Sequence, residues 1–275
     1  MTIPVHNGMP FIRETLNSVL PQLGANDEVI VVDNASEDGT SEYLSTVHDS
    51  RVRCINRSET QSMAANWTQA IAETSGKYVK LMCADDMLLP GCIEQQVAAL
   101  DSVAEASLVA SQRMIVDEWD SVLIRRHGLN GLKKRGTCRD TIRRCLRAGT
   151  NLVGEPSALM FRSNQIKSAM PWGDKWPYVL DISTYARLDA ESEFIFVHEP
   201  LACFRVSRNS GSAQLLGEQA RDFRQWRDAL LSSSEYRWTR IDSIASKINL
   251  FGRSLARRYY FRKVARKAKA MSEGA

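Results

Sequence analysis

Acidic residues follow two apolar runs in the first hundred residues of this 275-residue chain. Asp33 comes directly after the run 29–32, and Asp85 and Asp86 come shortly after the run 78–82. If both runs are parallel strands, their carboxyl ends border the crevice in which open α/β sheets bind ligands. The spacing therefore predicts a ligand site that contains all three carboxylates.

The pair Asp85 and Asp86 has the chemistry of a metal site. Carboxylate oxygens are hard ligands suited to Mg²⁺ or Mn²⁺. A divalent ion held there would act as a Lewis acid and neutralise a departing diphosphate. The alternative interpretation is a pair that only caps a turn after a strand, and the pattern alone leaves both interpretations open.

Composition indicates an ordinary globular protein. The chain is 44% hydrophobic and 25% charged, and its length suffices to bury a core without an external staple. The six cysteines include no Cys-x-x-Cys pair and no Cys/His cluster at zinc spacing, which indicates reduced thiols. No apolar stretch approaches the ~20 residues of a membrane span, and residues 1–20 lack a signal-peptide pattern, so we expect a cytoplasmic protein.

Residues 253–269 contain eight Arg or Lys residues and no acidic residue, with apolar residues interleaved. This pattern is typical of a basic amphipathic helix, although the net charge of the whole chain is only +4. A solvated face packed on the body and a peripheral contact with an anionic membrane surface are equally good interpretations. A nucleic-acid partner is not expected, because no nucleic-acid-binding motif accompanies the segment.

The first hundred residues alternate strand-like and helix-like segments, which predicts βαβ units and a parallel sheet. The expected strands cover residues 2–5, 29–32, 52–55 and 78–82. The expected helices start at Pro10, at an N-cap Thr40, at an N-cap Ser62 and at Pro90. Almost nothing precedes the first strand, so either that strand is short or the natural start lies upstream of Met1.

Beyond residue 100 the alternation is lost. Short strands are expected at 107–111, 113–116, 122–125 and 157–161, together with a helix capped by Thr137. From Glu218 onward the apolar spacing is helical. The fold class predicted from these patterns is α/β.

Four segments, in this order, resemble the motifs of family 2 glycosyltransferases of the inverting GT-A type. They are Ile3–Gly8, Val31–Thr40, Asn66–Ala70 and Gly76–Gly91, with weaker similarity at Asp181 and at Phe204–Ser207. The resemblance spans residue 3 to about residue 212. It implies a GT-A fold with a Rossmann-like nucleotide-binding half and a mixed central sheet.

The resemblance also implies roles for the residues at the strand ends. Asp85 occupies the main metal-binding position of the family's Asp-x-Asp motif. Asp33 resembles the residue that accepts a hydrogen bond from a ring N–H of the base. The residues expected to line or adjoin the base are Pro4, Val5, His6, Asn7 and Ser36. For His6, a hydrogen-bonded loop histidine is as good an interpretation as stacking on the base, and Asp38-Gly39 is interpreted as a turn.

Inversion requires a general base that takes a proton from the acceptor hydroxyl, and one ionised carboxylate suffices. Asp181 resembles the family's Glu-Asp site, although Leu180 replaces the usual preceding acid. Asp174, in the loop between Trp172 and Trp176, is the second candidate to face an acceptor. The alternative for Asp181 is a helix N-terminal carboxylate favoured by the macrodipole.

Three further side chains have two interpretations each. Trp172 and Trp176 are predicted to form an apolar platform for a sugar ring, and packing against the body is the alternative. Arg205 is predicted to pair with a diphosphate, and a buried structural ion pair is the alternative. Cys83 stands where many relatives carry the first acid of the metal motif, and Ser207 stands near a position where some carry a metal-binding histidine.

The combined prediction is a GT-A domain over 1–212, divided into a nucleotide-sugar half at 1–100 and an acceptor half at 101–212, with a helical extension at 213–275. It transfers a sugar from a nucleotide diphosphate donor, expected to be a UDP-sugar, to a glycan or lipid-linked acceptor in cell-surface polysaccharide synthesis. One rival is a sugar nucleotidyltransferase, but residues 4–8 match its phosphate loop poorly. Another is a catalytically impaired nucleotide-sugar-binding module, which Cys83, Leu180 and Ser207 favour.

Overall fold

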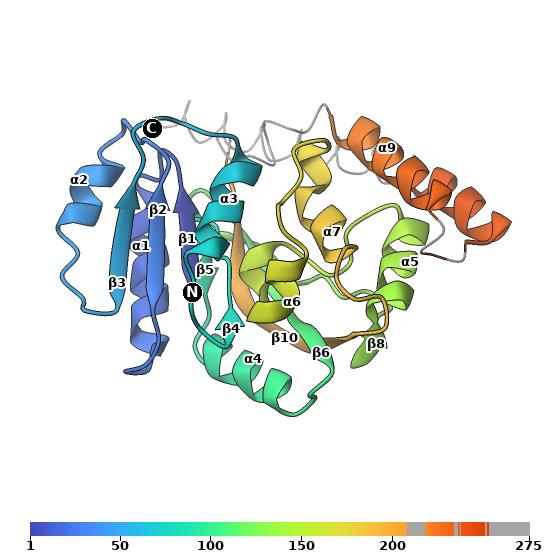
Figure 1. Cartoon of the computed structure of the whole chain (residues 1–275), viewed down its shortest axis with the longest axis horizontal. Coiled ribbons are helices and arrows are strands. Elements are labelled where there is room, and N and C mark those ends of the chain that lie inside the picture. Colours follow the sequence, from blue (N-terminus) through green and yellow to red (C-terminus); the bar gives the residue numbers. More distant parts are fainter. Residues whose placement is uncertain (208–217, 234–235, 237, 251, 253–275) are drawn as a thin grey trace.

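Three parallel strands form one edge of the molecule in the computed structural model, which describes residues 1–207, 218–233, 236, 238–250 and 252. Strand β1 (Thr2–Val5) pairs with β2 (Val29–Asp33), which pairs with β3 (Val52–Asn56). These strands form the left-hand side of Figure 1. The apolar residues of β1 and β2 do not alternate with exposed polar ones, because these two strands are buried on both faces. The sequence prediction of these strands is confirmed.

Four helices accompany this half: α1 (Phe11–Val19), α2 (Thr40–Ser45), α3 (Met63–Ala72) and α4 (Cys92–Asp101). The Ser62 side chain caps α3 as predicted, with its hydroxyl accepting from Ala65 N–H at 3.2 Å. The prediction that Thr40 caps α2 is wrong. The N-cap is Gly39, at φ +91°, and the Thr40 hydroxyl instead accepts from the N–H of Gly8 at 2.9 Å, where it ties two loops together.

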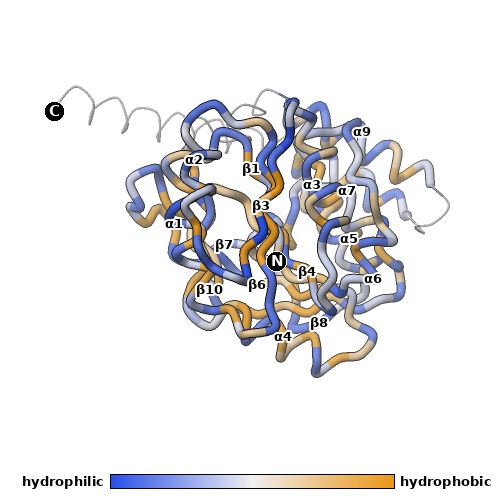
Figure 2. The backbone as a smooth tube through the Cα atoms, turned by 60° about the vertical axis from the view of Figure 1, so that its left-hand side comes forward, coloured by the Kyte–Doolittle hydropathy of each residue, from blue (hydrophilic) through white to orange (hydrophobic). Residues whose placement is uncertain are grey.

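The small sheet continues into a larger mixed sheet through residues 80–82. Thr2 N–H donates to Lys80 O and Met82 N–H donates to Thr2 O, both at 2.9 Å. The larger sheet has the order β4-β9-β6-β10-β5, with β7 paired to β6 and β8 paired to β10. Its strands are β4 (Tyr78–Val79), β5 (Met87–Leu88), β6 (Ala106–Asp117), β7 (Val122–His127), β8 (Arg135–Thr137), β9 (Leu159–Arg162) and β10 (Glu193–Val206). Figure 2 shows apolar stretches gathered mainly in the interior of the molecule and polar stretches mainly in the outer loops.

Two long strands depart from the expected pattern. The segments expected at 107–111 and 113–116 form one continuous strand, β6, which runs parallel to β10. No strand was predicted over β10, where the sequence offered only the weak family similarity at Phe204–Ser207. Its middle contains His198-Glu199-Pro200, which resembles a turn, and the register shifts between Val197 and Pro200. A bulge of this kind hides a strand from pattern analysis, because it interrupts the alternation of apolar residues.

The remaining helices are α5 (Cys138–Ala148), α6 (Ser163–Ser168), α7 (Leu180–Tyr185), α9 (Gln219–Ser232) and a helix at residues 240–250, with 3-10 turns at η1 (Leu20–Gln22), η2 (Pro156–Ala158) and η3 (Pro177–Val179). Thr137 caps α5 as predicted, since its hydroxyl accepts from Asp140 N–H at 3.1 Å. No helix in the described part of the chain is long and apolar enough to cross a membrane. The expected domain boundary at residue 212 and the basic segment 253–269 lie outside the described residues.

A buried lysine joins the strand that precedes Asp85 to the neighbouring elements. Lys80 is 2% exposed. Its ammonium donates to Gln96 Oε1 at 3.0 Å, to Ser157 O at 2.7 Å and to Leu159 O at 3.0 Å. All three N–H donors of the ammonium are therefore used, as a buried charge requires. Cys83 N–H donates to Ser157 Oγ at 3.0 Å, which fixes the backbone just before the Asp-Asp pair.

Candidate active site

The carboxyl ends of β1 and β2 bring the first predicted group together. In the parallel register Val5 lies opposite Asp33. Pro4 and Val5 are buried, whereas His6 and Asn7 are exposed where the strand ends. The first residues of the site are therefore fixed by the sheet, and only the two that follow the strand are open to a ligand.

Side-chain hydrogen bonds hold the loops after β1 and β2 to each other. Asn7, in a left-handed conformation at φ +52°, donates its N–H to Ser36 Oγ at 2.8 Å and accepts from Glu37 N–H at 2.9 Å. His6 Nδ1 lies 2.9 Å from Asn34 O. Because a carbonyl only accepts, Nδ1 carries the proton in this contact. His6 is thus a hydrogen-bonded loop histidine whose ring is still exposed.

Asp33 is 1% exposed and strongly hydrogen-bonded. One carboxylate oxygen accepts from Ser36 N–H at 3.2 Å and from the Ser36 hydroxyl at 2.5 Å, and the other accepts from the Ser41 hydroxyl. Donors of this kind hold a carboxylate in one orientation. Only Oδ2, which accepts from Ser41 alone, can still accept a further hydrogen bond, because a carboxylate has about four acceptor positions, two on each oxygen.

The second predicted group, Asp85 and Asp86, lies in the turn just before β5. Asp86 is fully buried, and its Oδ1 accepts from the N–H of Arg205 at 2.9 Å. Its Oδ2 is buried without a hydrogen-bond partner. Burial raises the pKa of Asp85, and burial together with the charge of Asp85 raises the pKa of Asp86 well above its usual range. Two adjacent carboxylates with an unpaired buried oxygen fit a divalent cation, which would favour the ionised form of both.

Cys83 does not replace the missing acid. Burial raises the pKa of its thiol well above the ordinary value, and the charges of Asp86 and Asp85 raise it further. A protonated thiol is a poor ligand for a hard cation. Among the described residues, no cluster of three His, Cys, Asp or Glu side chains is placed to hold a metal ion. A cation held here would therefore take its remaining ligands from water and from the substrate, as Mg²⁺ commonly does.

Arg205 takes the second of its two interpretations. The side chain is 1% exposed, and its guanidinium is paired with Glu14 and, at 2.7 Å, with Asp120. It also lies over the ring of Phe11, 4.4 Å from the centroid, and its Nε donates to Asp85 O at 2.9 Å. The expected pairing with a diphosphate is thus replaced by a buried ion pair. Arg205 instead positions both acids, Asp85 through its carbonyl and Asp86 through its carboxylate.

Asp181 lies in the first turn of α7. Its carboxylate accepts from Asn151 Nδ2 at 2.6 Å and from the N–H of Ile182 at 2.6 Å. The pKa of Asp181 is raised to about 7: burial is the largest cause and the charge of Glu155 adds to it, while hydrogen bonds from Ile182 and Asn151 and the charge of Arg113 oppose the rise. A carboxylate with a pKa near the working pH is suited to general-base chemistry. Leu180, in place of the usual preceding acid, is 3% exposed and belongs to the core.

Glu155 is a site residue that sequence reasoning missed. Its charge acts on the pKa values of both Asp86 and Asp181, so it lies within electrostatic range of the two predicted acidic groups. Arg113 holds it in place, with Nη2 donating to Glu155 Oε1 at 2.9 Å. The side chain of Arg113 is 4% exposed, and that of Glu155 is 29% exposed. Glu155 can therefore face a ligand while its charge remains paired.

Two glycines make room for this pair. Gly128 and Gly154 both have positive φ, at +94° and +120°. A Cβ on Gly128 would clash with Arg113 Nη1, and one on Gly154 would lie 3.1 Å from the same atom. The signal available in the sequence was Gly154-Glu155-Pro156, an acid held between two turn-forming residues.

The predicted acceptor loop contains one buried and two accessible residues. Trp172 is 3% exposed and packs edge-on against Trp67, with ring centroids 4.9 Å apart. The prediction of a sugar platform at Trp172 is therefore wrong, and packing against the body is the correct interpretation. Trp176 is partly exposed, and the exposed Asp174 accepts from Ser62 Oγ at 3.0 Å. That hydrogen bond ties the loop to the start of α3.

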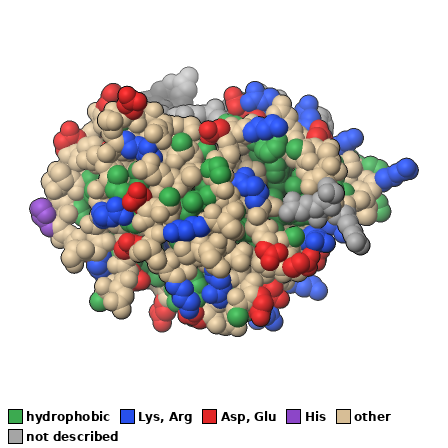
Figure 3. Space-filling view, viewed as in Figure 1, with side chains coloured by type: hydrophobic (Ala, Val, Ile, Leu, Met, Phe, Trp, Pro, Cys, Tyr) green, Lys and Arg blue, Asp and Glu red, His purple; other side chains and the backbone are tan. Residues whose placement is uncertain are grey.

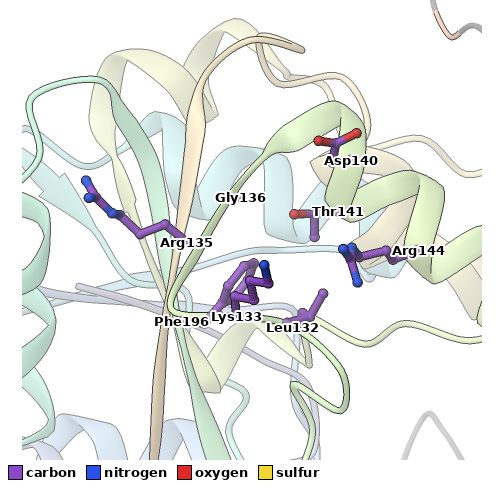
Figure 4. A pocket seen from close by; sticks show the side chains of 8 residues that line it. All are labelled: Leu132, Lys133, Arg135, Gly136, Asp140, Thr141, Arg144 and Phe196. Carbon is purple, nitrogen blue, oxygen red and sulfur yellow. The ribbon is translucent and has the colours of Figure 1, made fainter.

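A separate hollow of about 200 Å³ opens between β8 and α5 (Figure 4). It is lined by Leu132, Lys133, Arg135, Gly136, Asp140, Thr141, Arg144 and Phe196. None of the predicted site residues lines it. It is therefore not the nucleotide site that the strand ends indicate.

Comparisons with known proteins agree with this geometry. The family model described as "Glycosyl transferase family 2" matches residues 2–164. The chain is 24% identical to "Uncharacterized protein MT1568" of Mycobacterium tuberculosis over 208 residues. This alignment covers 74% of this chain and 65% of that protein. Over 118 residues the chain is 26% identical to "Putative glycosyltransferase EpsE" of Bacillus subtilis, covering 42% of each. The chain thus spans less than two thirds of the length of these curated relatives.

Two solved structures share the fold. S. aureus TarS 1–349 in complex with UDP-GlcNAc superposes with a TM-score of 0.66 at 14% identity, covering 94% of this chain and 72% of that one. The mannosyltransferase PcManGT of Pyrobaculum calidifontis, in complex with GDP-Man and Mn²⁺, superposes with a TM-score of 0.62 at 16% identity, covering 92% of this chain and 68% of that one. Both are similar to this chain in their GT-A fold.

Proposed function

The chain belongs to glycosyl transferase family 2, and on that premise we propose that it is an inverting glycosyltransferase that uses a nucleotide diphosphate sugar. The observation that carries the proposal is the placement of Asp33, of the Asp85-Asp86 pair and of Asp181, with Glu155 in electrostatic range of the last two. The pKa of Asp181, raised to about 7, suits a general base and so supports turnover over a binding module that has lost it.

The donor half is proposed to bind the nucleotide after β1 and β2. Asp33 would accept from a ring N–H of the base, and the exposed ring of His6 would lie against its face. A uracil base offers such an N–H, so we propose a UDP-sugar, a class represented by the UDP-GlcNAc bound to TarS. Asn7 and Ser36 would form the walls of this site, and the buried Pro4 and Val5 would support it from within the sheet.

Asp85 and Asp86 are proposed to hold Mg²⁺ or Mn²⁺ through Asp85 and the unpaired Oδ2 of Asp86. The ion would supply neutralisation of the diphosphate charge. Arg205 and Thr15 fix the backbone of the two acids, since Arg205 Nε donates to Asp85 O and the Thr15 hydroxyl lies 2.8 Å from Asp86 O.

Asp181 is proposed to accept the proton of the attacking acceptor hydroxyl while Asn151 holds its carboxylate in place. Glu155, Asp174 and Trp176 would contact the acceptor, which we propose to be a glycan or a lipid-linked glycan in cell-surface polysaccharide synthesis. Similarity to "Putative teichuronic acid biosynthesis glycosyltransferase TuaG" of Bacillus subtilis, 30% identical over 96 residues, supports this class. A cytoplasmic enzyme could reach a lipid-linked acceptor through contact between the basic residues 253–269 and an anionic membrane surface.

The test of the donor site is thermal unfolding with a panel of nucleoside diphosphates, with and without Mn²⁺, for wild type and Asp85→Asn. A ligand at ~100 times its dissociation constant adds roughly 2.7 kcal/mol of stability, which gives a clear shift in Tm. We expect a shift with UDP that requires Mn²⁺ and is lost in Asp85→Asn. Absence of any nucleotide-dependent shift would refute the proposal, and binding without donor turnover would favour the impaired binding module.

A further inference from the structure

Three isoleucines on the helix at residues 240–250 are more exposed than any other large apolar side chain that the structure describes. Ile241, Ile244 and Ile248 are 69%, 59% and 66% exposed. Spacings of three and seven residues place them on one face of the helix. The next most exposed, Trp119 and Val122, are each 45% exposed and lie at the β6–β7 connection. A contiguous apolar stripe of this kind marks an interaction surface.

Contacts on the opposite face of this helix hold it against the body of the protein, so that the three isoleucines point toward solvent. Asp242 is fully buried and accepts from Arg143 Nη2 at 2.8 Å and from Arg147 Nε. Asn249 Nδ2 donates to Arg147 O at 2.8 Å. A Cβ added to Gly149 would lie 2.6 Å from Leu250 N, so the helix is packed closely against the end of α5. Rotation that would bury the isoleucines would break all these contacts.

Charge identifies the partner as anionic. Arg240 and Lys247 on the same helix are exposed, and Asp242, the only acid of this helix, is buried. Figure 3 shows apolar and basic side chains together at the corresponding right-hand edge of the molecule. The sequence that follows adds eight basic residues and no acid between residues 253 and 269. A second copy of this chain would bring the same positive charge to a symmetric contact, which disfavours self-association.

We propose that the face formed by Ile241, Ile244 and Ile248 inserts into the headgroup region of an anionic bilayer, with Arg240 and Lys247 contacting lipid phosphates. An apolar stripe flanked by basic residues is the pattern of a helix that lies in the membrane interface. The inference rests on the proposed function in one respect: membrane contact would bring the enzyme close to a lipid-linked acceptor. This contact requires insertion of apolar side chains, whereas a contact made by the basic residues 253–269 would be purely electrostatic.

The test is co-sedimentation of the full chain with vesicles of phosphatidylglycerol and phosphatidylcholine, and with vesicles of phosphatidylcholine alone. We expect binding to the anionic vesicles and at least about tenfold weaker binding in the triple variant Ile241→Ala, Ile244→Ala, Ile248→Ala, because the inserted apolar area is lost. Alanine is a good helix former and the replaced side chains are exposed, so the helix is retained. The matched control is the triple Ile→Leu variant, which preserves apolar area and should bind like wild type.

Wild-type affinity in the alanine variant would overturn the proposal, since the basic segment alone would then account for binding. So would a wild-type chain that ignores anionic vesicles. Self-association lost in the alanine variant, without vesicle binding, would assign the face to a second copy instead. The UDP-dependent shift in Tm, measured on the same samples, separates these outcomes from failure of the proposed function.

Discussion

The pKa of Asp181 gives the sharpest prediction about catalysis. A general base must be ionised, and the pKa of Asp181 is about 7. The ionised fraction is then about one tenth at pH 6 and about nine tenths at pH 8, so kcat/KM should rise roughly tenfold between these values. Initial rates of UDP release with donor and acceptor, measured from pH 5 to pH 9, would show the midpoint. Asp181→Asn should lower kcat by about 10²- to 10⁴-fold and abolish the midpoint.

Glu155→Gln tests the cause of the raised pKa. The charge of Glu155 raises the pKa of Asp181 and the charge of Arg113 lowers it. Glu155→Gln removes the charge of Glu155 and leaves that of Arg113, so the midpoint of the kcat/KM–pH profile should move to lower pH. A midpoint near pH 4 in the wild type, or a shift to higher pH in Glu155→Gln, would refute the reasoning.

The same pKa has a consequence for stability. In the folded chain Asp181 has a pKa above its ordinary value of 3.8, so folding favours the protonated form. The free energy of unfolding should therefore fall as the pH rises from about 4 through about 7, by at most about 4 kcal/mol. Asp181→Asn cannot ionise and should escape this loss. Urea unfolding of both proteins at pH 5 and pH 8 would show whether their difference grows with pH.

Three further changes should have defined effects. Gly128→Ala should lower the free energy of unfolding, measured in urea, by about 2 to 4 kcal/mol, because it combines positive-φ strain with a clash on Arg113. Gly131→Ala is the control, since Gly131 has φ +75° but open space where a Cβ would lie, and it should cost only about 1 kcal/mol. Equal losses of stability in the two variants would contradict the packing argument. Cys83→Asp should lower Tm in the absence of metal, because it adds a third acid beside two acids of raised pKa. It should also increase the rise in Tm that Mn²⁺ produces, because the new carboxylate is a hard ligand. A Tm of this variant that does not change with metal would count against a cation site. Asp242→Asn should lower the free energy of unfolding by about 2 kcal/mol at pH 7. Hydrogen bonds from Arg143, Thr239 and Arg147 keep the pKa of Asp242 below its usual range, so its carboxylate is ionised at that pH. The difference in stability between wild type and variant should shrink as the pH falls below about 4.

Local signals predicted most of the first hundred residues. Strand-like runs alternating with helix-like segments identified β1, β2 and β3, and the hydroxyls of Ser62 and, further along the chain, Thr137 identified helix starts. These elements follow from interactions between residues close in sequence, so periodicity and capping suffice to find them. The strand β10 was missed, since its bulge near Pro200 breaks the pattern.

Contacts between distant residues decided the roles of several side chains. Trp172, in a loop, is buried because Trp67, on helix α3, covers it. Arg205 is unavailable to a diphosphate because Glu14 and Asp120 meet it from two other segments. Neither outcome is visible in the few residues around each position, because burial depends on what the fold places opposite a side chain.

The sequence by itself determined the parallel strands β1, β2 and β3 and the acid Asp33 at the carboxyl end of β2, because these follow from local pattern. It also placed Asp181 at the start of a helix, where it could not be distinguished from an ordinary helix-end carboxylate. Only the tertiary structure supplied what makes that carboxylate suited to act as a base: burial, Asn151 at 2.6 Å and the charges of Glu155 and Arg113. A pKa depends on the dielectric and on the charges around a group, and those are set by residues that only the fold brings together.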